Sequence, residues 1–595
     1  MRISPWVLHP TRLLVPTLGI WLPLNAQVNW RSPESLQSSY RNISSASGQA
    51  LVVTANPLAS DAAIRTLKKG GTAMDAIVTA QAVLTVVEPQ SSGLGGGGFL
   101  LYWDQKKNHL HALDGRETAS VHATQETWLD SNGTPISWKD ASKSLSSIGV
   151  PGTTALLWEG HKRFGRLSWE KNFTESIRIA SDGFFPSPRF INSISLAKQI
   201  GVSHSPTFKS LYLPSGLPPS PLVPFQNKDL AATLTRIAKG GAEEFYRGKT
   251  AKQLINDLAQ QQSKRKSIQT ITSEDLANYQ VYERQPVCRL YRQWRICSMP
   301  PPSGGGIAVL QTLGIYEELT ISSSSTRGVS HWHLFAEALR LADADRSHWV
   351  GDPIDWSVPV DGLLSDNYLK GRAKKINLKS TTIAPLPGEP KGGELLNLAS
   401  QPRTAGGGTT HIVVVDAMGN IASYTGSVET VFGSRYISGG MVLNNQLTDF
   451  SFIPSIADKS IANRIGPNKR PMSSMAPVIV FHNERPVMAL GSPGGWLIPH
   501  YVANALIRSL DFNLPPKEVV SKMNLSVDPR QTFLENRAKD AEAPTSSLIH
   551  KGLTKLGHKV KAIRFSSGLA LIQWKNGVWH GAADPRREGK AVSLK

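Results

Sequence analysis

The sequence predicts a mixed α+β protein whose helices and strands dominate different parts of the chain. Helical patterns dominate residues 50–370, whereas short apolar runs typical of strands dominate after residue 409. The 595-residue chain exceeds the roughly 250–300 residues at which one core stops growing, so two domains or one large composite domain are expected. With 40% apolar and 18% charged residues, the composition excludes disorder over most of the chain.

Two helices are expected where the folded part begins. The first is expected to be capped at Ser60-Asp61 and to run to Lys69. Thr72 is placed to cap the second, residues 73–87, which is apolar nearly all round and is therefore expected to be buried. The glycine run 95–98 follows a helix rather than a strand, so it predicts a tight turn with close backbone approach and not a dinucleotide site.

An abrupt change of character marks the middle of the chain. Residues 379–408 are rich in Pro, Gly, Ser and Lys without any period, which predicts a long mobile loop. A strand at 411–415, a turn at 416–420 and a second strand at 421–427 follow at once. Further strands are predicted at 441–445, 476–482 and 486–490, followed by a helix at 496–510. A hairpin that turns at Asn576-Gly577 is predicted at 570–580.

The N-terminus has the pattern of an export signal. Two arginines precede an apolar run at 13–24, which is too short for a bilayer because a span needs about 20 residues. Residues 1–26 are interpreted as a signal peptide, with an uncleaved anchor as the alternative, and residues 27–48 as a linker. The mature protein is therefore expected to be exported, periplasmic or extracellular, with no stable membrane span.

Charge and cysteine content narrow the function classes. Lys and Arg number 65 against 45 Asp and Glu, a net charge of +20 that favours anionic partners. The basic residues are scattered without interleaved aromatics, so no nucleic-acid partner is predicted. Two cysteines exclude a disulfide framework and any all-cysteine metal site. Cys288 and Cys297 flank a possible hairpin and are expected to pair in an oxidising compartment, with two buried thiols as the alternative.

The usual catalytic motifs are incomplete. The spacing between the two glycines of the candidate phosphate-binding loop does not match that motif. The Lys-Thr-Gly motif of penicillin-recognising serine enzymes is missing, which argues against that class. His411 shares a strand face with Thr409, but the strand rise separates them by about 6.6–6.8 Å, too far for a hydrogen bond. His411 is therefore interpreted as a structural histidine.

Several sequence blocks together resemble the γ-glutamyltransferase family of N-terminal nucleophile hydrolases. They occur in the family's order and cover nearly the whole chain from about residue 50 to 590. The blocks are EPQSSGLGGGGF, LDGRE, MPPPSGGG, the stretch from Gly406 to Phe450, GPNKRPMSSMAP, GSPGG and GAADPRREG.

The resemblance implies a four-layer αββα sandwich formed by two fragments of one precursor. The implied cleavage lies between Gly408 and Thr409, giving a large subunit, 49–408, and a small subunit, 409–595. Cleavage frees the Thr409 α-amine, whose reference pKa of about 7.7–8.0 suits a general base for the Thr409 hydroxyl. No metal and no organic cofactor are implied.

The resemblance also assigns catalytic roles by position. Thr409 corresponds to the nucleophile, and Ser427 stands where the family has a threonine that supports it. Gly494 and Gly495 match the glycines of the oxyanion hole, at a predicted helix N-terminus where the helix dipole favours negative charge.

Five further positions match the family's substrate-binding residues. Arg116 corresponds to the arginine that binds the substrate α-carboxylate, and a guanidinium forks onto two carboxylate oxygens. Ser473 and Ser474 match the serines that hydrogen-bond the same carboxylate, while Gln446 and Asp449 match the pair that receives the α-ammonium.

Three departures from the family pattern concern the donor. Glu429 replaces an amide that contacts the nucleophile and the substrate amine, and Thr448 replaces the first Asp of an Asp-Asp pair. The segment 451–465 corresponds to a lid but is short and lacks the family's tyrosine. These changes resemble a branch that includes acylases acting on cephalosporin-type side chains.

Three functions follow as hypotheses. The first is an exported γ-glutamyltransferase or hydrolase that cleaves γ-glutamyl amides such as glutathione and passes the glutamyl group to water or to an amino acid or peptide. The second keeps the machinery and changes the donor to another acyl amide. The third is an inactive family member that binds the cell envelope, suggested by the net charge of +20.

Overall fold

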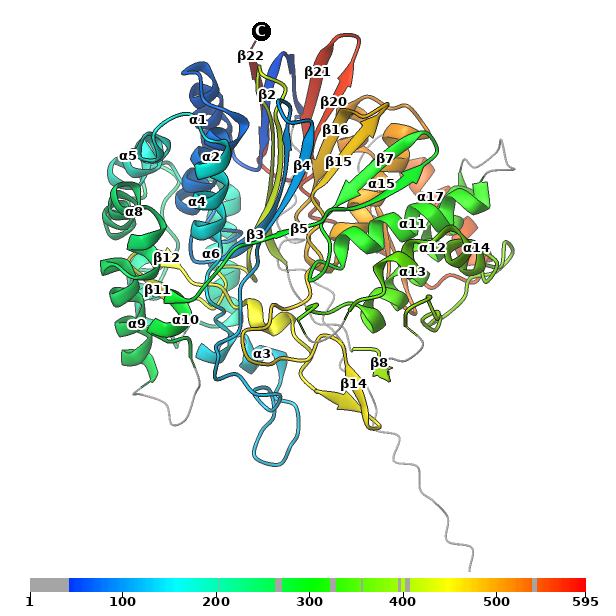
Figure 1. Cartoon of the computed structure of the whole chain (residues 1–595), viewed down its shortest axis with the longest axis horizontal. Helices are drawn as coiled ribbons and strands as arrows, with labels where there is room; N and C mark the ends of the chain where they lie inside the picture. The colour runs from blue at the N-terminus through cyan, green and yellow to red at the C-terminus, as the bar shows by residue number, and fades with distance from the viewer. Residues whose placement is uncertain are drawn as a thin grey trace, which may run out of the picture. The chain divides into compact units, whose positions relative to one another are not determined.

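Two seven-stranded sheets lie at the centre of the structure, and helices lie on the outer side of each sheet (Figure 1). The structure is a computed structural model that describes residues 42–202, 204–262, 270–320, 328–354, 357–393, 397–401, 407–537 and 543–594. The interpreted signal peptide and residues 27–41 of the interpreted linker lie outside these residues. In the part of the chain that is described, no helix is long and apolar enough to cross a membrane.

The first sheet carries the strand that contains Thr409. Its strand order is β22-β2-β9-β10-β3-β4-β5, so β9 and β10 lie near its centre. Its strands are β2 (Ala50–Thr54), β3 (Gly97–Asp104), β4 (His109–Gly115), β5 (Tyr282–Arg284), β9 (Gly408–Val415), β10 (Ile421–Glu429) and β22 (Lys590–Leu594).

The second sheet has the order β1-β21-β20-β16-β15-β7-β6 and is antiparallel throughout. Its strands are β1 (Ser44–Gly48), β6 (Val287–Tyr291), β7 (Trp294–Ser298), β15 (Val478–His482), β16 (Arg485–Gly491), β20 (Ala570–Lys575) and β21 (Val578–Ala583). Both sheets combine strands from before and after residue 409, so both parts of the chain contribute to the same two large hydrophobic cores.

Each sheet packs against its own group of helices. The first group comprises α1 (Pro57–Lys68), α2 (Ala73–Val87), α4 (Thr153–Phe164), α5 (Thr174–Asp182), α6 (Pro188–Ile200), α7 (Pro206–Tyr212), α8 (Lys228–Tyr246), α9 (Lys249–Gln262) and α10 (Ser273–Ala277). The second comprises α11 (Gly305–Thr320), α12 (Val329–Trp349), α14 (Asp366–Ala373), α15 (Ile498–Leu510), α16 (Pro516–Ser521) and α17 (Ala543–Lys555).

Short elements complete the fold around the ends of the sheets. They are α3 (Trp138–Ala141), α13 (Val360–Leu364), β8 (Leu398–Ala399), β11 (Ile437–Ser438), β12 (Met441–Val442), β13 (Ser455–Ile456), β14 (Lys459–Ile461), β17 (Leu525–Val527), β18 (Thr532–Glu535), β19 (Val560–Ile563) and the 3-10 turns η2 (Leu145–Ser147), η3 (Trp169–Phe173), η4 (Gln446–Asp449) and η5 (Gly495–Leu497).

The apolar run of β9 is explained by burial on both faces. Ile412 and Val414 belong to the core shared with α1 and α2, whereas Val413 and Val415 belong to the core between the sheets. Successive strand residues point to opposite faces, so a strand covered on both sides needs apolar residues at every position. The first helical group, the two sheets and the second helical group therefore form four layers.

Of the two helix starts predicted near the beginning of the fold, that of α2 is confirmed and that of α1 is wrong. Helix α2 begins after Thr72 as expected, because Thr72 and Asp75 form a capping box. The expected start of α1 is wrong. This helix begins at Pro57, and its cap is Asn56, whose side chain accepts a 3.0 Å hydrogen bond from the Leu58 N–H.

The strand predictions around residue 409 are confirmed. The expected strands at 411–415 and 421–427 are β9 and β10, each two or three residues longer at the end that approaches the site. The expected hairpin at the C-terminal end is β20–β21, turning at Asn576 and Gly577, both with positive φ. In the predicted loop 379–408, the described residues contain only β8 and the start of β9.

Two further expectations concern the edges of the second sheet. Residues 44–48 of the interpreted linker form β1, which pairs with β21, so the linker interpretation is wrong there. Their period is two, with side chains alternating between half-buried and exposed, but small serines make that pattern weak in the sequence. Cys288 and Cys297 face each other across the β6–β7 hairpin and form a disulfide bond.

Candidate active site

Thr409 lies at the N-terminal end of β9, directly opposite Ser427 on β10. Beyond this pair the register shifts, so that Glu429 pairs with Gly408 across a β-bulge. A Cβ atom at Gly408 would lie 2.6 Å from the Thr430 carbonyl oxygen, which explains why the residue before Thr409 has no side chain. The bulge and the glycine together bring the Gly408–Thr409 peptide bond against the end of β10.

The Ser427 hydroxyl links both sides of that peptide bond. Its Oγ donates a 2.6 Å hydrogen bond to the Gly408 carbonyl oxygen and accepts one of 3.3 Å from the Thr409 hydroxyl. The Glu429 N–H donates to the same Oγ at 2.9 Å. A hydroxyl has one proton and two lone pairs, so these three bonds use all of its capacity and fix its orientation.

Gly494 and Gly495 form a turn between β16 and the helix α15. Their φ values are +139° and +58°, and a Cβ atom at Gly494 would lie 2.5 Å from Cε2 of Tyr501. Neither backbone N–H has a hydrogen-bond partner among the described residues. Gly495 lines the same pocket as Thr409, so its free N–H is available to a developing anion there.

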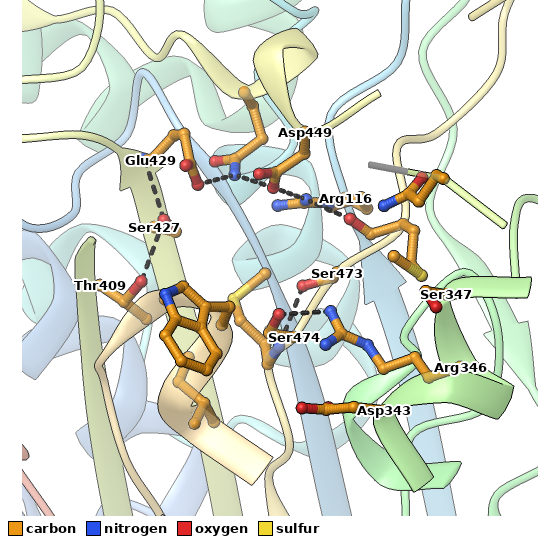
Figure 2. Close-up of a pocket in the computed structure, with 17 residues that line it drawn as sticks. Arg116, Asp343, Arg346, Ser347, Thr409, Ser427, Glu429, Asp449, Ser473 and Ser474 are labelled. Atoms are coloured by element: carbon orange, nitrogen blue, oxygen red, sulfur yellow. Dashed lines mark hydrogen bonds and ion pairs between the residues drawn. The ribbon is translucent and has the colours of Figure 1, made fainter. Parts of the chain in front are cut away.

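A pocket with about 710 Å³ of empty space, including solvent at its mouth, opens in front of Thr409 (Figure 2). It brings together most of the residues singled out from the sequence. Thr409, Ser427, Gly495, Arg116, Glu429, Gln446, Asp449, Ser473 and Ser474 all line it. Gly494 and Gly408 do not, but each is the chain neighbour of a lining residue.

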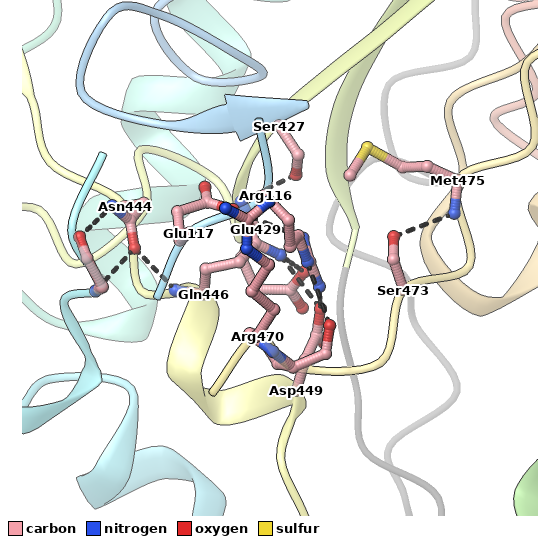
Figure 3. A network of polar contacts seen from close by, with 12 residues as sticks. Arg116, Glu117, Ser427, Glu429, Asn444, Gln446, Asp449, Arg470, Ser473 and Met475 are labelled. Atoms are coloured by element: carbon pink, nitrogen blue, oxygen red, sulfur yellow. Dashed lines mark hydrogen bonds and ion pairs between the residues drawn. The ribbon is translucent and has the colours of Figure 1, made fainter. Parts of the chain in front are cut away.

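A charged network lines one wall of this pocket (Figure 3). Arg116 Nη2 lies 2.5 Å from the Asp449 carboxylate, and Gln446 Nε2 donates both to Asp449 at 3.0 Å and to Glu429 at 2.9 Å. Glu117 lies behind Arg116, with its carboxylate 3.6 Å from Arg116 Nη1. The buried Arg116 guanidinium thus contacts two of the three carboxyl groups, and Gln446 links the third, Glu429, to Asp449.

The excess of carboxyl groups in this network changes their acidity. Burial raises the pKa of Glu429 well above its ordinary value, and the nearby Asp449 charge raises it further. Burial also raises the pKa of Glu117 to about 7, against the opposing charge of Arg116. Among the described residues, no side chain or backbone group makes a hydrogen bond with either Glu117 carboxyl oxygen or with Oε1 of Glu429. Glu429 also has a φ of +80°, a left-handed conformation that asparagine tolerates better than glutamate.

The two serines of the opposite wall are held by the MPPPSGGG block. The Gly304 N–H donates to the Ser473 carbonyl oxygen at 2.8 Å, and the Ser473 N–H donates to the Pro302 carbonyl oxygen at 2.9 Å. Ser473 Oγ accepts from the Met475 N–H, whereas Ser474 Oγ accepts from Nη2 of Arg346 at 2.5 Å. Sequence blocks far apart in the chain therefore meet at this wall.

Sequence reasoning missed several residues of the site. Arg346, Asp343 and Trp496 line the pocket, and Arg587 donates to the Thr409 carbonyl oxygen at 3.0 Å. Arg587 belongs to the GAADPRREG block, which was a usable signal. Arg346 is an isolated arginine on a helix, and no local pattern distinguishes it from a solvated residue.

His411 takes the structural place expected for it. The side chain is buried, Nδ1 lies 2.8 Å from the Thr425 hydroxyl, and burial lowers its pKa to about 3. The ring is bound to Thr425 inside the sheet, and its lowered pKa makes it a weak base.

Comparisons with known proteins agree with this geometry. Residues 59–594 match the sequence model of the family described as Gamma-glutamyltranspeptidase. The chain is 34% identical over 583 residues to a protein named glutathione hydrolase proenzyme from Bacillus subtilis strain 168, with 96% of each covered. It is 31% identical over 563 residues to a protein named acylase ACY 1 proenzyme from Pseudomonas sp. strain SE83, covering 91% of this chain and 93% of that protein.

A solved structure supports the same relationship. The cephalosporin acylase from Bacillus halodurans matches with a TM-score of 0.80 and 26% sequence identity, covering 94% of this chain and 98% of that chain. This likeness confirms the expected four-layer fold of the N-terminal nucleophile hydrolases.

Proposed function

The chain belongs to the gamma-glutamyltranspeptidase family, and from that premise we propose that it cuts itself before Thr409 and then cleaves γ-glutamyl amides such as glutathione. The observation that carries this proposal is the Ser427 hydroxyl, which bonds the Gly408 carbonyl oxygen and the Thr409 hydroxyl at once. The nucleophile and the bond to be cut are thus held by one side chain.

Self-cleavage begins with attack of Thr409 Oγ1 on the Gly408 carbonyl carbon. The C–N bond breaks, an ester forms between Gly408 and the Thr409 oxygen, and the released α-amine takes up the proton. Water then hydrolyses the ester, giving a Gly408 carboxylate and a free Thr409 hydroxyl. The products are a large subunit that ends at Gly408 and keeps β1, and the small subunit, 409–595, which remain joined because both sheets contain strands from each.

Turnover uses the α-amine made by that cut. The amine removes the Thr409 hydroxyl proton while Oγ1 attacks the γ-carbonyl carbon of the donor. The N–H groups of Gly494 and Gly495 stabilise the oxyanion, and the leaving amine departs with the proton. Water, an amino acid or a peptide then attacks the acyl-enzyme and releases the glutamyl group.

Donor recognition follows from the charged wall. The α-carboxylate and α-ammonium of an amino acid sit on one carbon atom, and Arg116 and Asp449 lie next to each other with a 2.5 Å contact. Such a pair complements a zwitterion, with Gln446 supporting the ammonium side and Ser473 and Ser474 the carboxylate side.

A second candidate is an acylase for another acyl amide. Glu429 favours it, because an acid of raised pKa stands where the family has an amide that contacts the substrate amine. A protonated Glu429 needs no ammonium partner, so a donor without the α-amine fits the same wall. The third hypothesis, an inactive envelope-binding protein, is disfavoured by the intact Thr409 and oxyanion glycines.

The discriminating experiment is a donor panel with matured enzyme. γ-Glutamyl-p-nitroanilide and glutathione are compared with the matching glutaryl amides, which lack only the α-amine. A preference of roughly 100-fold in kcat/KM for the γ-glutamyl donors, about 2.7 kcal/mol of transition-state binding, supports the first function. Failure to cleave either γ-glutamyl donor contradicts it, and cleavage of glutaryl amides alone favours the acylase. Export to a periplasm or the extracellular space remains part of the proposal, to be tested by fractionation.

A further inference from the structure

Arg346 brings a second guanidinium group to the pocket. It lies in the last turn of α12, and Figure 2 shows its side chain directed at Ser474, on the side of the view away from Thr409. Its Nη2 donates a 2.5 Å hydrogen bond to Ser474 Oγ. Ser473 and Ser474 are the residues proposed above to bind the donor carboxylate, so a cation stands beside that subsite.

Gly304 makes room for this arginine. A Cβ atom at Gly304 would lie 2.8 Å from Nε and 2.9 Å from Cγ of Arg346, so any larger residue would displace the side chain. The Gly304 N–H is itself bonded to the Ser473 carbonyl oxygen at 2.8 Å. The loop that holds the two serines therefore also sets the path of Arg346 into the pocket.

Arg116 does not present a free fork to a carboxylate. Its Nε donates to the Pro471 carbonyl oxygen at 3.2 Å, and its Nη2 is shared between Asp449 and the Met472 carbonyl oxygen. Its Nη1 lies 3.6 Å from the Glu117 carboxylate. A donor carboxylate at Arg116 has to compete with Asp449, so the subsite gains from a second cation.

We propose that Arg346 is a specificity-determining residue that binds the α-carboxylate of the donor together with Ser474. This inference rests on the proposed function. It names the side chain that recognises the end of the donor's acyl group farthest from the scissile amide. A guanidinium offers N–H groups in a planar fork that matches a carboxylate, and Ser474 adds a hydroxyl beside it. Asp343, one turn earlier on α12, lies 3.1 Å from His500 Nε2, which gives that carboxylate a partner of its own.

A purely structural role makes a different prediction. If Arg346 only braces Ser474, its loss disturbs the wall for every donor alike. If Arg346 binds the carboxylate, its loss affects donors that carry this charge and spares those that carry a neutral amide. The comparison of two donors that differ only there separates the two roles.

The kinetic test uses matured wild type, Arg346→Gln and Arg346→Lys. The donors are γ-glutamyl-p-nitroanilide and its α-carboxamide, and the control variant is Arg178→Gln on α5, an exposed arginine away from the pocket. Arg346→Gln is expected to raise KM for the carboxylate donor at least tenfold, with kcat within twofold and the carboxamide donor unchanged. Arg346→Lys is expected to give a KM for the carboxylate donor between the values of wild type and Arg346→Gln. Equal changes for both donors, or no change, overturn the proposal.

A binding measurement covers variants that fail to mature. The pocket exists in the uncut chain, so Thr409→Ala with and without Arg346→Gln is titrated by calorimetry with L-glutamine, L-glutaminamide and glutaramate. Arg346→Gln is expected to weaken the two carboxylate ligands about tenfold and to spare L-glutaminamide. Binding of glutaramate but not glutamine contradicts the γ-glutamyl function while leaving Arg346 testable on glutaramate. Absence of binding by both carboxylate ligands at millimolar concentration overturns the Arg346 proposal.

Discussion

Ser427 Oγ donates a 2.6 Å hydrogen bond to the carbonyl oxygen of Gly408, the residue that precedes the proposed nucleophile. The same oxygen accepts the Thr409 hydroxyl proton at 3.3 Å. A donor on the carbonyl oxygen makes its carbon more electrophilic, and an acceptor on the hydroxyl orients the attacking oxygen. This one side chain therefore acts on both partners of the proposed cleavage.

Ser427→Ala removes both contacts and is expected to slow self-cleavage by about 10–100-fold. That range corresponds to about 1.4–2.7 kcal/mol, which is typical of a hydrogen bond to a group that becomes charged. Ser427→Thr keeps the hydroxyl and is the matched control, expected to cleave at a rate close to that of wild type. The time course of fragment appearance on denaturing gels measures both rates, and equal rates for Ala and Thr contradict the role given to Ser427.

Gly494→Ala is expected to lower kcat by about 10²–10³, the usual effect of a lost oxyanion donor. The added Cβ atom would lie 2.5 Å from Tyr501, so the turn that carries the Gly494 and Gly495 N–H groups must move. Gly577→Ala is the control, because Gly577 also has positive φ but no atom within 4 Å of the Cβ position. If both variants keep wild-type kcat after maturation, the turn is not the oxyanion hole.

Glu429→Gln is expected to flatten the pH dependence of KM for an amine-bearing donor. Burial and Asp449 raise the pKa of Glu429, so its carboxyl group is protonated at low pH and gains a negative charge as pH rises. That charge attracts the substrate ammonium, so wild-type KM for γ-glutamyl-p-nitroanilide is expected to fall with rising pH. KM profiles of both enzymes across the whole pH range in which the protein stays folded check this, with the glutaryl anilide as the donor without an amine. A wild-type KM that is flat in pH contradicts it.

Glu117→Gln is expected to stabilise the protein relative to wild type as pH rises. The folded protein holds the Glu117 proton up to a pKa of about 7, whereas the unfolded chain releases it near 4.5. Between these values the unfolded state binds fewer protons, so wild type loses stability, by about 3 kcal/mol in full. The Tm difference between variant and wild type should therefore grow from pH 5 to pH 8. The exposed Glu126→Gln is the control, and parallel Tm profiles for Glu117→Gln and wild type refute the assignment.

The elements that could be predicted from the sequence are those fixed by local contacts or marked by a local pattern. The capping box of Thr72 and Asp75 and the Asn576-Gly577 turn depend on neighbours within a few residues. The apolar run of β9 is packed by distant elements, but burial on both faces leaves an unbroken apolar run that is visible in the sequence. Strand β1 could not be predicted, because its serines leave only a weak alternation and its order depends on pairing with β21.

For the site, too, many of the residues could be identified from the sequence, whereas the contacts between them could not. Family order placed Arg116, Asp449 and Glu429 in one pocket, but their mutual contacts depend on side-chain packing that no spacing encodes. Arg346 reaches Ser474 across 128 residues of sequence, and only the tertiary fold brings the two together. The raised pKa values of Glu117 and Glu429 were equally beyond sequence reasoning, because they arise from burial beside Asp449.

The most direct test of the central claim is intact mass and N-terminal sequencing of the purified protein beside Thr409→Ala. The account predicts a fragment that begins at Thr409 and runs to Lys595 in wild type, and its absence in the variant. A single uncut wild-type chain after long incubation at neutral pH would contradict the account, because the Thr409 α-amine required as the base would never form.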